Sequence, residues 1–221
     1  MKKIILTLVL IMITSSLASA NVLMTANSLG AGKIGWLIDG KYDSNTQSTG
    51  NVTFTGVGGF LGYGLTEKLD IFGELGYGTY GNLPSGLSAR EIMLGLAAKY
   101  QLVTESGDMP VSVAALLAFQ PSTATLTLGS ASGQAVQDDI SLGAIVSKVT
   151  GPWAPYGALV YHSFTTNPGA TTGTNLEIAL GSQMHLSKAS ALVGEVSLNS
   201  ISTGGTSFSD TQVSLGYTAK I

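Results

Sequence analysis

Long segments in which apolar and polar side chains alternate are the feature that most limits how this chain can fold. Three of these segments cover residues 91–103, 175–186 and 211–221. A period of two over ten or more residues predicts a β-strand whose two faces lie in different surroundings. Because strands in soluble sheets are usually about 5–6 residues long, these segments predict an unusually tall sheet.

Composition identifies a membrane as the surroundings of one face. The chain has 221 residues, of which 44% are hydrophobic and only 10% are charged, and its mean hydropathy is +0.34. Yet no segment after residue 20 reaches the ~18 consecutive apolar residues that indicate a transmembrane helix. A transmembrane β-barrel reconciles these observations, since each strand needs only about 9–11 residues with one apolar face. Open strand edges cannot persist in lipid, so the sheet is expected to close.

We therefore expect an all-β fold, a transmembrane antiparallel up-and-down β-barrel of about ten strands, with eight as the alternative. The expected strands are residues 33–42, 52–65, 69–80, 89–103, 110–120, 138–149, 155–166, 174–186, 191–200 and 210–221. Short connections at 66–68, 104–109, 150–154 and 187–190 alternate with longer ones, rich in Gly, Ser, Thr and Asn, at 43–51, 81–88, 121–137, 167–173 and 201–209. This alternation is typical of short periplasmic turns and long extracellular loops, and it places both termini in the periplasm.

The short turn at residues 66–68 allows a test of register. Joining the flanking strands through it pairs Tyr63 with Ile71 on a face expected to meet lipid, and Gly62 with Phe72 on the opposite face. The patterns of the two strands agree on this single register, as expected where one face is buried.

Two motifs resemble those of bacterial outer-membrane β-barrels. The stretch from Gly62 to Ile71, GYGLTEKLDI, resembles their periplasmic hairpins. The ending from Gly216 to Ile221, GYTAKI, is similar to the C-terminal signal read by the barrel-assembly machinery, although Ile221 stands where Phe is usual. The resemblance implies a place in the outer membrane of a Gram-negative-type bacterium. It also implies outer-membrane lipids, lipopolysaccharide and the barrel-assembly machinery as partners.

The first twenty residues have the pattern of a secretory signal peptide. Two lysines precede an apolar run over residues 4–13, and an Ala-Ser-Ala cleavage pattern ends at Ala20. We expect residues 1–20 to be removed, residues 21–32 to form an N-terminal periplasmic segment and residues 33–221 to form the barrel. The alternative is an uncleaved anchor.

Charge and cysteine content exclude several function classes. A net charge of −3 and an isoelectric point near 5.2 argue against a nucleic-acid partner. Without cysteine, the chain has no disulfide, thiolate metal site or cysteine nucleophile. No phosphate-binding loop or metal-ligand spacing is found, so neither a cofactor nor a metal is expected.

Most charged residues of the expected strands have the parity of the inward face. We expect the lumen to be lined by Asp39, Lys41, Asp70, Glu74, Glu91, Lys99, Glu177, His185 and Glu195. The excess of carboxylates predicts an acidic lumen that favours small cations, as in a narrow porin-like channel. A hydrogen-bonded polar plug that holds a structural barrel together is the other interpretation, because buried charges need partners.

Outward parity and position at strand ends predict contacts with the membrane interface. Arg90 is expected at the extracellular end, near lipopolysaccharide phosphates, and Lys148 at the periplasmic end, where it can reach phospholipid headgroups. Aromatic residues at strand ends are expected to form interfacial belts. They are Tyr63, Tyr100, Trp153, Tyr156 and Tyr217 on the periplasmic side, and Tyr42, Tyr80 and Phe164 on the extracellular side.

A barrel enzyme, either a rim protease or a lipid hydrolase, is the alternative function. Resemblance to the ten-stranded outer-membrane proteases would imply an Asp–His couple at the extracellular rim, for which Asp139 and His162 are the candidates. However, His162 shares a face with Tyr156, Val160 and Phe164, which we expect to meet lipid. No set of nucleophile, base and orienting group emerges, so no catalytic residue is expected.

Overall fold

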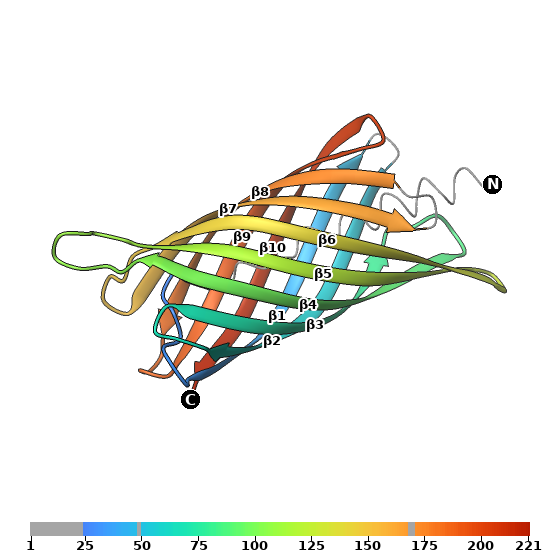
Figure 1. Ribbon diagram of the computed structural model, residues 1–221. Helices are drawn as coiled ribbons and strands as arrows, with labels where there is room; N and C mark the ends of the chain where they lie inside the picture. Colours follow the sequence, from blue (N-terminus) through green and yellow to red (C-terminus); the bar gives the residue numbers. More distant parts are fainter. Residues whose placement is uncertain (1–23, 48–49, 168–170) are drawn as a thin grey trace.

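The chain forms a closed barrel of ten antiparallel strands in the computed structural model, which describes residues 24–47, 50–167 and 171–221 (Figure 1). The strands are β1 Ile34–Gln47, β2 Gly50–Gly64, β3 Leu69–Gly81, β4 Leu87–Val103, β5 Ser112–Leu128, β6 Ala131–Ser147, β7 Trp153–Asn167, β8 Thr171–His185, β9 Ser190–Thr203 and β10 Thr206–Lys220. The predicted fold class and the strand number of ten are confirmed. The expected signal peptide lies outside the described residues.

Pairing between the first and last strands closes the sheet. β1 and β10 pair from Gly35 opposite Lys220 to Asn45 opposite Asp210. With this pairing the barrel has no free edge, so its strands are not available to pair with other chains. Among the described residues, no helix combines the length and apolar character needed to cross a membrane.

The register predicted for the β2–β3 hairpin is confirmed. Tyr63 lies opposite Ile71 and Gly62 lies opposite Phe72. Tyr63 is 43% exposed on the outside, whereas Phe72 is 8% exposed and points inward. The inward glycine is needed, because a Cβ at Gly62 would lie 2.5 Å from the Phe72 ring.

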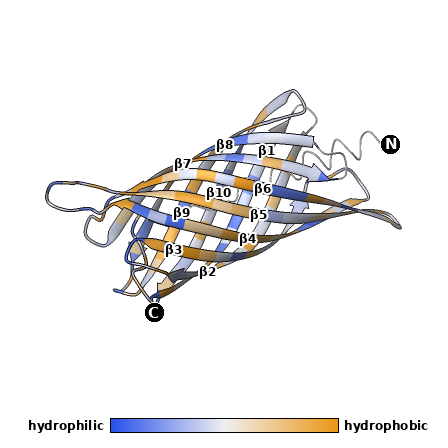
Figure 2. Cartoon of the chain, in the orientation of Figure 1, coloured by the Kyte–Doolittle hydropathy of each residue, from blue (hydrophilic) through white to orange (hydrophobic). Residues whose placement is uncertain are grey.

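An apolar band runs around the outside of the barrel. Leu94, Leu180 and Leu215 are 54%, 66% and 69% exposed, as their parity predicted. Figure 2 shows hydrophobic stretches along the middle of β4, β5 and β6 and more hydrophilic strand ends. Toward the strand ends farthest from the C-terminus, the outward side chains become Ser and Thr, such as Thr125 and Thr211. The outer surface therefore changes from apolar to polar along the barrel axis, as expected for a band that spans a membrane.

The predicted contrast between short turns and long loops is wrong for the described residues. The segment 121–137, predicted as a loop, continues β5 and β6 to a tight turn at Gly129 and Ser130. Likewise 201–209 is strand apart from Gly204 and Gly205, whose φ angles of 56° and 80° suit a two-residue hairpin turn. Ser- and Thr-rich composition indicated loops, but these segments keep the alternation of strands that extend into water.

The predicted lipid face of β7 is also wrong. Tyr156, Val160, His162 and Phe164 do share a face, but it is the interior face, and all four are at most 5% exposed. The opposite face carries Leu159 and other apolar residues. Because both faces of β7 are apolar, its alternation does not identify the lipid side, and a one-residue error reverses every side chain.

Three of the aromatic residues predicted for the interfacial belts therefore lie inside the barrel. They are Tyr80, Tyr156 and Phe164, which are 7%, 5% and 1% exposed. Tyr80 has the opposite parity to the exposed Tyr77, so its place at a strand end was not enough to put it on the outside. The other five are exposed as predicted: Tyr42, Tyr63, Tyr100, Trp153 and Tyr217.

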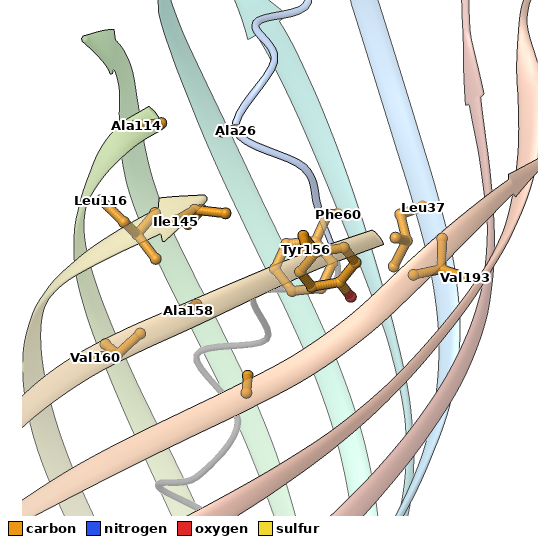
Figure 3. Close-up of a cluster of buried hydrophobic side chains, with 11 residues drawn as sticks. Ala26, Leu37, Phe60, Ala114, Leu116, Ile145, Tyr156, Ala158, Val160 and Val193 are labelled. Atoms are coloured by element: carbon orange, nitrogen blue, oxygen red, sulfur yellow. The ribbon is translucent and has the colours of Figure 1, made fainter. Parts of the chain in front are cut away.

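Apolar clusters fill the interior near both ends. The cluster nearer the C-terminus includes Phe60, Tyr156 and Val160 and surrounds Ala26, which lies on the segment preceding β1 (Figure 3). A second cluster, around Phe54 and Met93, lies toward the opposite end. Charged and amide side chains occupy the space between these clusters, so the barrel interior is a packed core with a polar middle.

Substitution of Leu215 by Arg tests the membrane-facing assignment. We expect the free energy of unfolding to fall by roughly 2–4 kcal/mol, because a charge then enters the middle of the apolar band. Thr211→Arg, on the same face of β10 near the polar end, is the matched control and should cost only about 0–1 kcal/mol. Denaturant unfolding from phospholipid vesicles measures both, and equal losses would contradict the assignment.

Candidate functional site in the barrel interior

Acidic side chains are concentrated inside the barrel. Nine of the thirteen Asp and Glu residues of the chain point inward: Asp39, Asp43, Asp70, Glu74, Glu91, Asp139, Glu177, Glu195 and Asp210. Of the lysines and arginines in the described residues, only Lys41 and Lys99 are buried. The interior thus holds a large excess of carboxylates.

Seven of the nine residues predicted to line the lumen are buried in the interior, each at most 4% exposed: Asp39, Lys41, Asp70, Glu91, Lys99, Glu177 and Glu195. Glu74 is partly exposed, but its Oε1 atom is buried. His185 is exposed and borders a cavity of about 240 Å³ at the end where the C-terminus lies. Whether ions pass along these residues stays a prediction.

Besides Asp139, which the sequence analysis weighed for the enzyme alternative, sequence reasoning missed two inward carboxylates, Asp43 and Asp210. Both fell in or beside segments taken as loops, 43–51 and 201–209. Extending the alternation of β1 and β10 past the apolar band would have assigned both to the inward face.

The segment before β1 enters the barrel at the mouth nearest the C-terminus and occupies part of it. Residues 24–33, called here the N-terminal segment, run from buried Thr25 and Ala26 to Lys33. The Ala26 amide donates a hydrogen bond to Ser147 Oγ (3.0 Å), an atom far away in sequence. The segment therefore acts as part of the packed interior.

Two charged side chains of the barrel wall hold the N-terminal segment. The Lys99 ammonium donates to the carbonyl oxygens of Thr25 (3.1 Å) and Asn27 (2.7 Å). Asp70 accepts the Leu29 amide on both carboxylate oxygens, each at 3.0 Å, and lies 3.4 Å from the Lys99 ammonium. Since all these groups are largely buried, the ion pair and the segment stabilise each other.

Further polar contacts complete this attachment. The Ser28 amide donates to Gln101 Oε1 (3.2 Å), and Ser112 Oγ donates to Asn27 Oδ1 (2.8 Å). The Lys99 ammonium also lies 5.5 Å from the centre of the Phe72 ring, within the range of a cation–π contact. The N-terminal segment is thus held in the mouth by specific contacts from several strands.

A central acidic group surrounds Lys41 in the middle of the barrel. We define it as Asp39, Asp43, Glu74 and Glu195, whose charges all interact with that of Lys41. Glu195 accepts a hydrogen bond from Tyr156 Oη (2.8 Å). Both carboxylate oxygens of Asp43, and the Lys41 ammonium itself, are buried without a hydrogen-bond partner among the described residues. The charge of one lysine is therefore shared among four carboxylates.

His162 lies at the centre of a second buried cluster. Its Nδ1 atom is 3.0 Å from Asp139 Oδ2 and 3.0 Å from Ser141 Oγ, and its Nε2 atom is 3.2 Å from Glu177 Oε2. All four side chains are 0% exposed. The Asp–His pair weighed for the enzyme alternative is therefore formed, inside the barrel and out of contact with lipid.

The geometry of this cluster does not match a nucleophile and its base. In a catalytic triad, the serine and the orienting carboxylate contact different ring nitrogens of the histidine. Here Ser141 and Asp139 share Nδ1, while Glu177 occupies Nε2. In the part of the chain that is described, no group of acidic and histidine side chains suits a metal ion. The cluster has the arrangement of a structural ion network.

The two cations assigned to the outer surface lie there. Arg90 and Lys148 are exposed on outward positions of β4 and beside the end of β6. Their contact with lipid headgroups stays a prediction.

No family model and no curated protein sequence matches the chain. Solved structures with a similar fold include the translocator domain of the autotransporter NalP from Neisseria meningitidis, with a TM-score of 0.57 at 12% identity over 86% of this chain and 88% of that one. The outer membrane protease OmpT from Escherichia coli has a TM-score of 0.50 at 10% identity, covering 86% and 96%. Neisserial surface protein A, NspA, has a TM-score of 0.50 at 16% identity, covering 86% and 99%.

These similarities concern the fold alone. The chain has the closed up-and-down architecture of bacterial outer-membrane β-barrels, as its sequence motifs predicted. Because proteins of different function share this architecture, function has to be argued from the interior and the surface of this chain.

Substitution of Lys99 by Met should release the N-terminal segment. The change removes the ion pair with Asp70 and two hydrogen bonds, so we expect the amides of residues 26–29 to exchange hydrogen about tenfold faster or more, the effect of losing one charged hydrogen bond of ~1.5–3 kcal/mol. Hydrogen exchange with mass spectrometry measures this. Lys220→Met, an exposed lysine at the same end, is the control. Fast exchange of these amides in the parent would contradict the closed mouth.

Substitution of His162 by Ala should destabilise the barrel strongly. It leaves Asp139 and Glu177 buried without their common partner, a type of change that costs about 3–5 kcal/mol. His185→Ala, at the exposed histidine, should change stability by at most about 0.5 kcal/mol. Guanidinium unfolding followed by tryptophan fluorescence compares the two, and similar small losses would show that the His162 cluster is not structural.

Proposed function

We propose that this chain is an integral protein of the bacterial outer membrane. The closed barrel, the outward apolar band and the exposed aromatic residues at its margins support this location. The signal-peptide pattern of residues 1–20 and the alternating apolar C-terminal ending agree with export and with insertion by the barrel-assembly machinery. Outer-membrane lipids and lipopolysaccharide are the partners that such a location supplies.

Within that membrane, the proposed function is a narrow pathway for small cations. The observation that carries this proposal is the charge imbalance of the interior, where nine carboxylates face two lysines and one histidine. Buried ionised groups need compensation, and cations that enter the barrel supply it where protein partners do not. Acidic side chains lining a pore favour cations over anions for the same reason.

The distribution of these charges favours a pathway over a purely structural core. A structural interior is expected to pair its ions directly, as Lys99 pairs with Asp70 and as His162 contacts Asp139 and Glu177. The central acidic group is not balanced in this way, because Lys41 is its only cation and forms no direct ion pair with a described residue. The carboxylates of the central acidic group are therefore the groups to which the proposal assigns the attraction of passing cations.

The proposed pathway is closed at rest and excludes large solutes. The N-terminal segment obstructs one mouth, and apolar clusters narrow the interior near both ends. Side chains must move before an ion passes, so we expect small and infrequent currents. A wide porin with an open aqueous channel does not fit this packing.

A barrel hydrolase is the second candidate, favoured only by the contact between Asp139 and His162. Both side chains are 0% exposed, and the neighbouring Ser141 shares the same imidazole nitrogen as Asp139. A substrate would have no access to this cluster, and the serine lacks a free imidazole nitrogen to receive its proton. The contact therefore supports a structural role more than catalysis.

Single-channel recording in planar bilayers tests the cation pathway. The refolded protein in a KCl gradient should give a small current whose reversal potential shows cation selectivity. The double substitution Glu74→Gln, Glu195→Gln should lower the cation preference by about tenfold or more, because a carboxylate about 10 Å away at an effective dielectric constant of about 20 attracts a cation by ~1.7 kcal/mol.

The matched control is Asp138→Asn, which neutralises an exposed, outward carboxylate next to Asp139. It should leave the selectivity unchanged. No current from the folded protein, either as it is or after Lys99→Met, would contradict the proposal and leave a structural barrel.

A further inference from the structure

The outer wall of the barrel carries a long apolar groove. Two adjoining hollows of about 670 and 710 Å³ share Leu61, Gly73, Leu96 and Phe119 as lining residues. Leu61, Leu96 and Phe119 are 63%, 68% and 44% exposed on the outward faces of β2, β4 and β5. The groove therefore opens toward the apolar band's surroundings, and we call it the β2–β5 groove.

The groove exists because small residues occupy outward positions between leucines. Gly73 lies between Leu61 on β2 and Leu96 on β4 in the register of the sheet. A Cβ at Gly73 would have no heavy atom within 4 Å, so the floor of the groove is open space. Gly59 on β2 and Ala98 on β4 extend this floor in the two directions. The missing side chains thus create the space.

At the end of the groove nearer Arg90, the pairing between β4 and β5 is interrupted. Their ladder pairs Met93 with Ser122 and resumes at Leu96 with Phe119. Pro121, which lines the groove, has no amide hydrogen to donate to β4.

A cation stands on the same outward face, beyond the apolar part of the groove. Arg90 is exposed on β4, four residues from Leu94 at the groove, which is roughly 13 Å at ~3.3 Å per residue. Its neighbours in the register are Thr79 and Thr125, so Arg90 stands at the polar margin of the apolar band. A guanidinium group there is suited to the oxygens of a phosphate.

We propose that the β2–β5 groove and Arg90 together bind one phosphorylated membrane lipid. An acyl chain of the lipid lies in the groove over Gly73, and its phosphate contacts the Arg90 guanidinium. Apolar lining alone does not select a lipid, because lipid tails are as apolar as leucine; the shape of the groove and the charge at its end do. This inference rests on the proposed location in a membrane and goes beyond it by naming a site.

The two tryptophans of the chain provide the test. Trp36 lines the groove. Trp153 lies at the start of β7 and does not line the groove. In a Trp153→Phe protein reconstituted in phosphatidylcholine vesicles, brominated phosphatidic acid should quench Trp36 fluorescence more than its mole fraction predicts. We expect phosphatidic acid to bind about fivefold more tightly than phosphatidylcholine. This ratio corresponds to ~1 kcal/mol for one basic residue at the membrane surface.

Four variants identify the parts of the site. Gly73→Leu should fill the groove and abolish the preference, whereas Gly40→Leu, at an outward glycine outside the groove with one backbone oxygen at 4.0 Å, should retain it. Arg90→Gln should reduce the preference to that of phosphatidylcholine. In a Trp36→Phe protein, Trp153 should report quenching in proportion to mole fraction only.

The possible failures are distinguishable. Proportional quenching of Trp36 by both lipids in every variant would overturn the lipid site and leave the membrane location intact. No quenching of either tryptophan by any brominated lipid would overturn the membrane location itself, and the lipid site with it.

Discussion

Closure of the sheet by pairing between β1 and β10 is the constraint on which the rest of this structure depends. A closed ladder satisfies the backbone groups of every strand without water, which is what a sheet surrounded by hydrocarbon requires. Closure also divides each strand into an inside and an outside face. From this division follow the apolar band outside, the acidic groups inside and the groove left by small outward residues over β2–β5.

The same closure makes the interior an expensive place for charge. The buried charges are compensated in different ways at different heights along the barrel. Near the C-terminus, Asp70 and Lys99 neutralise each other and bind the backbone of the N-terminal segment. In the middle, one lysine faces four carboxylates, and the remaining negative charge is what the proposed cation pathway uses. The Asp70–Lys99 pair thus stabilises the structure, whereas the central acidic group carries the proposed function.

Much of the fold could be predicted because the alternation of side chains carries the register. The β2–β3 hairpin was defined by two independent patterns, and its pairs are those of the structure. The alternation was ambiguous in β7, where Val160 and Leu159 are both apolar but point to opposite sides, so His162 was assigned to the wrong face. Ser- and Thr-rich segments were taken as loops for their composition, which concealed Asp43 and Asp210. The N-terminal segment gave no periodic signal, since its position depends on partners such as Ser147 that are distant in sequence.

The central claim is that ions pass through the acidic interior and that the N-terminal segment stands in their way. Because the chain has no cysteine, the double substitution Ala26→Cys, Ser147→Cys allows the segment to be bound to the wall by a disulfide or a short thiol cross-linker. We expect the cross-linked protein in a planar bilayer to carry no cation current, and cleavage of the link to restore the current of the parent. Equal currents before and after cleavage would contradict the account.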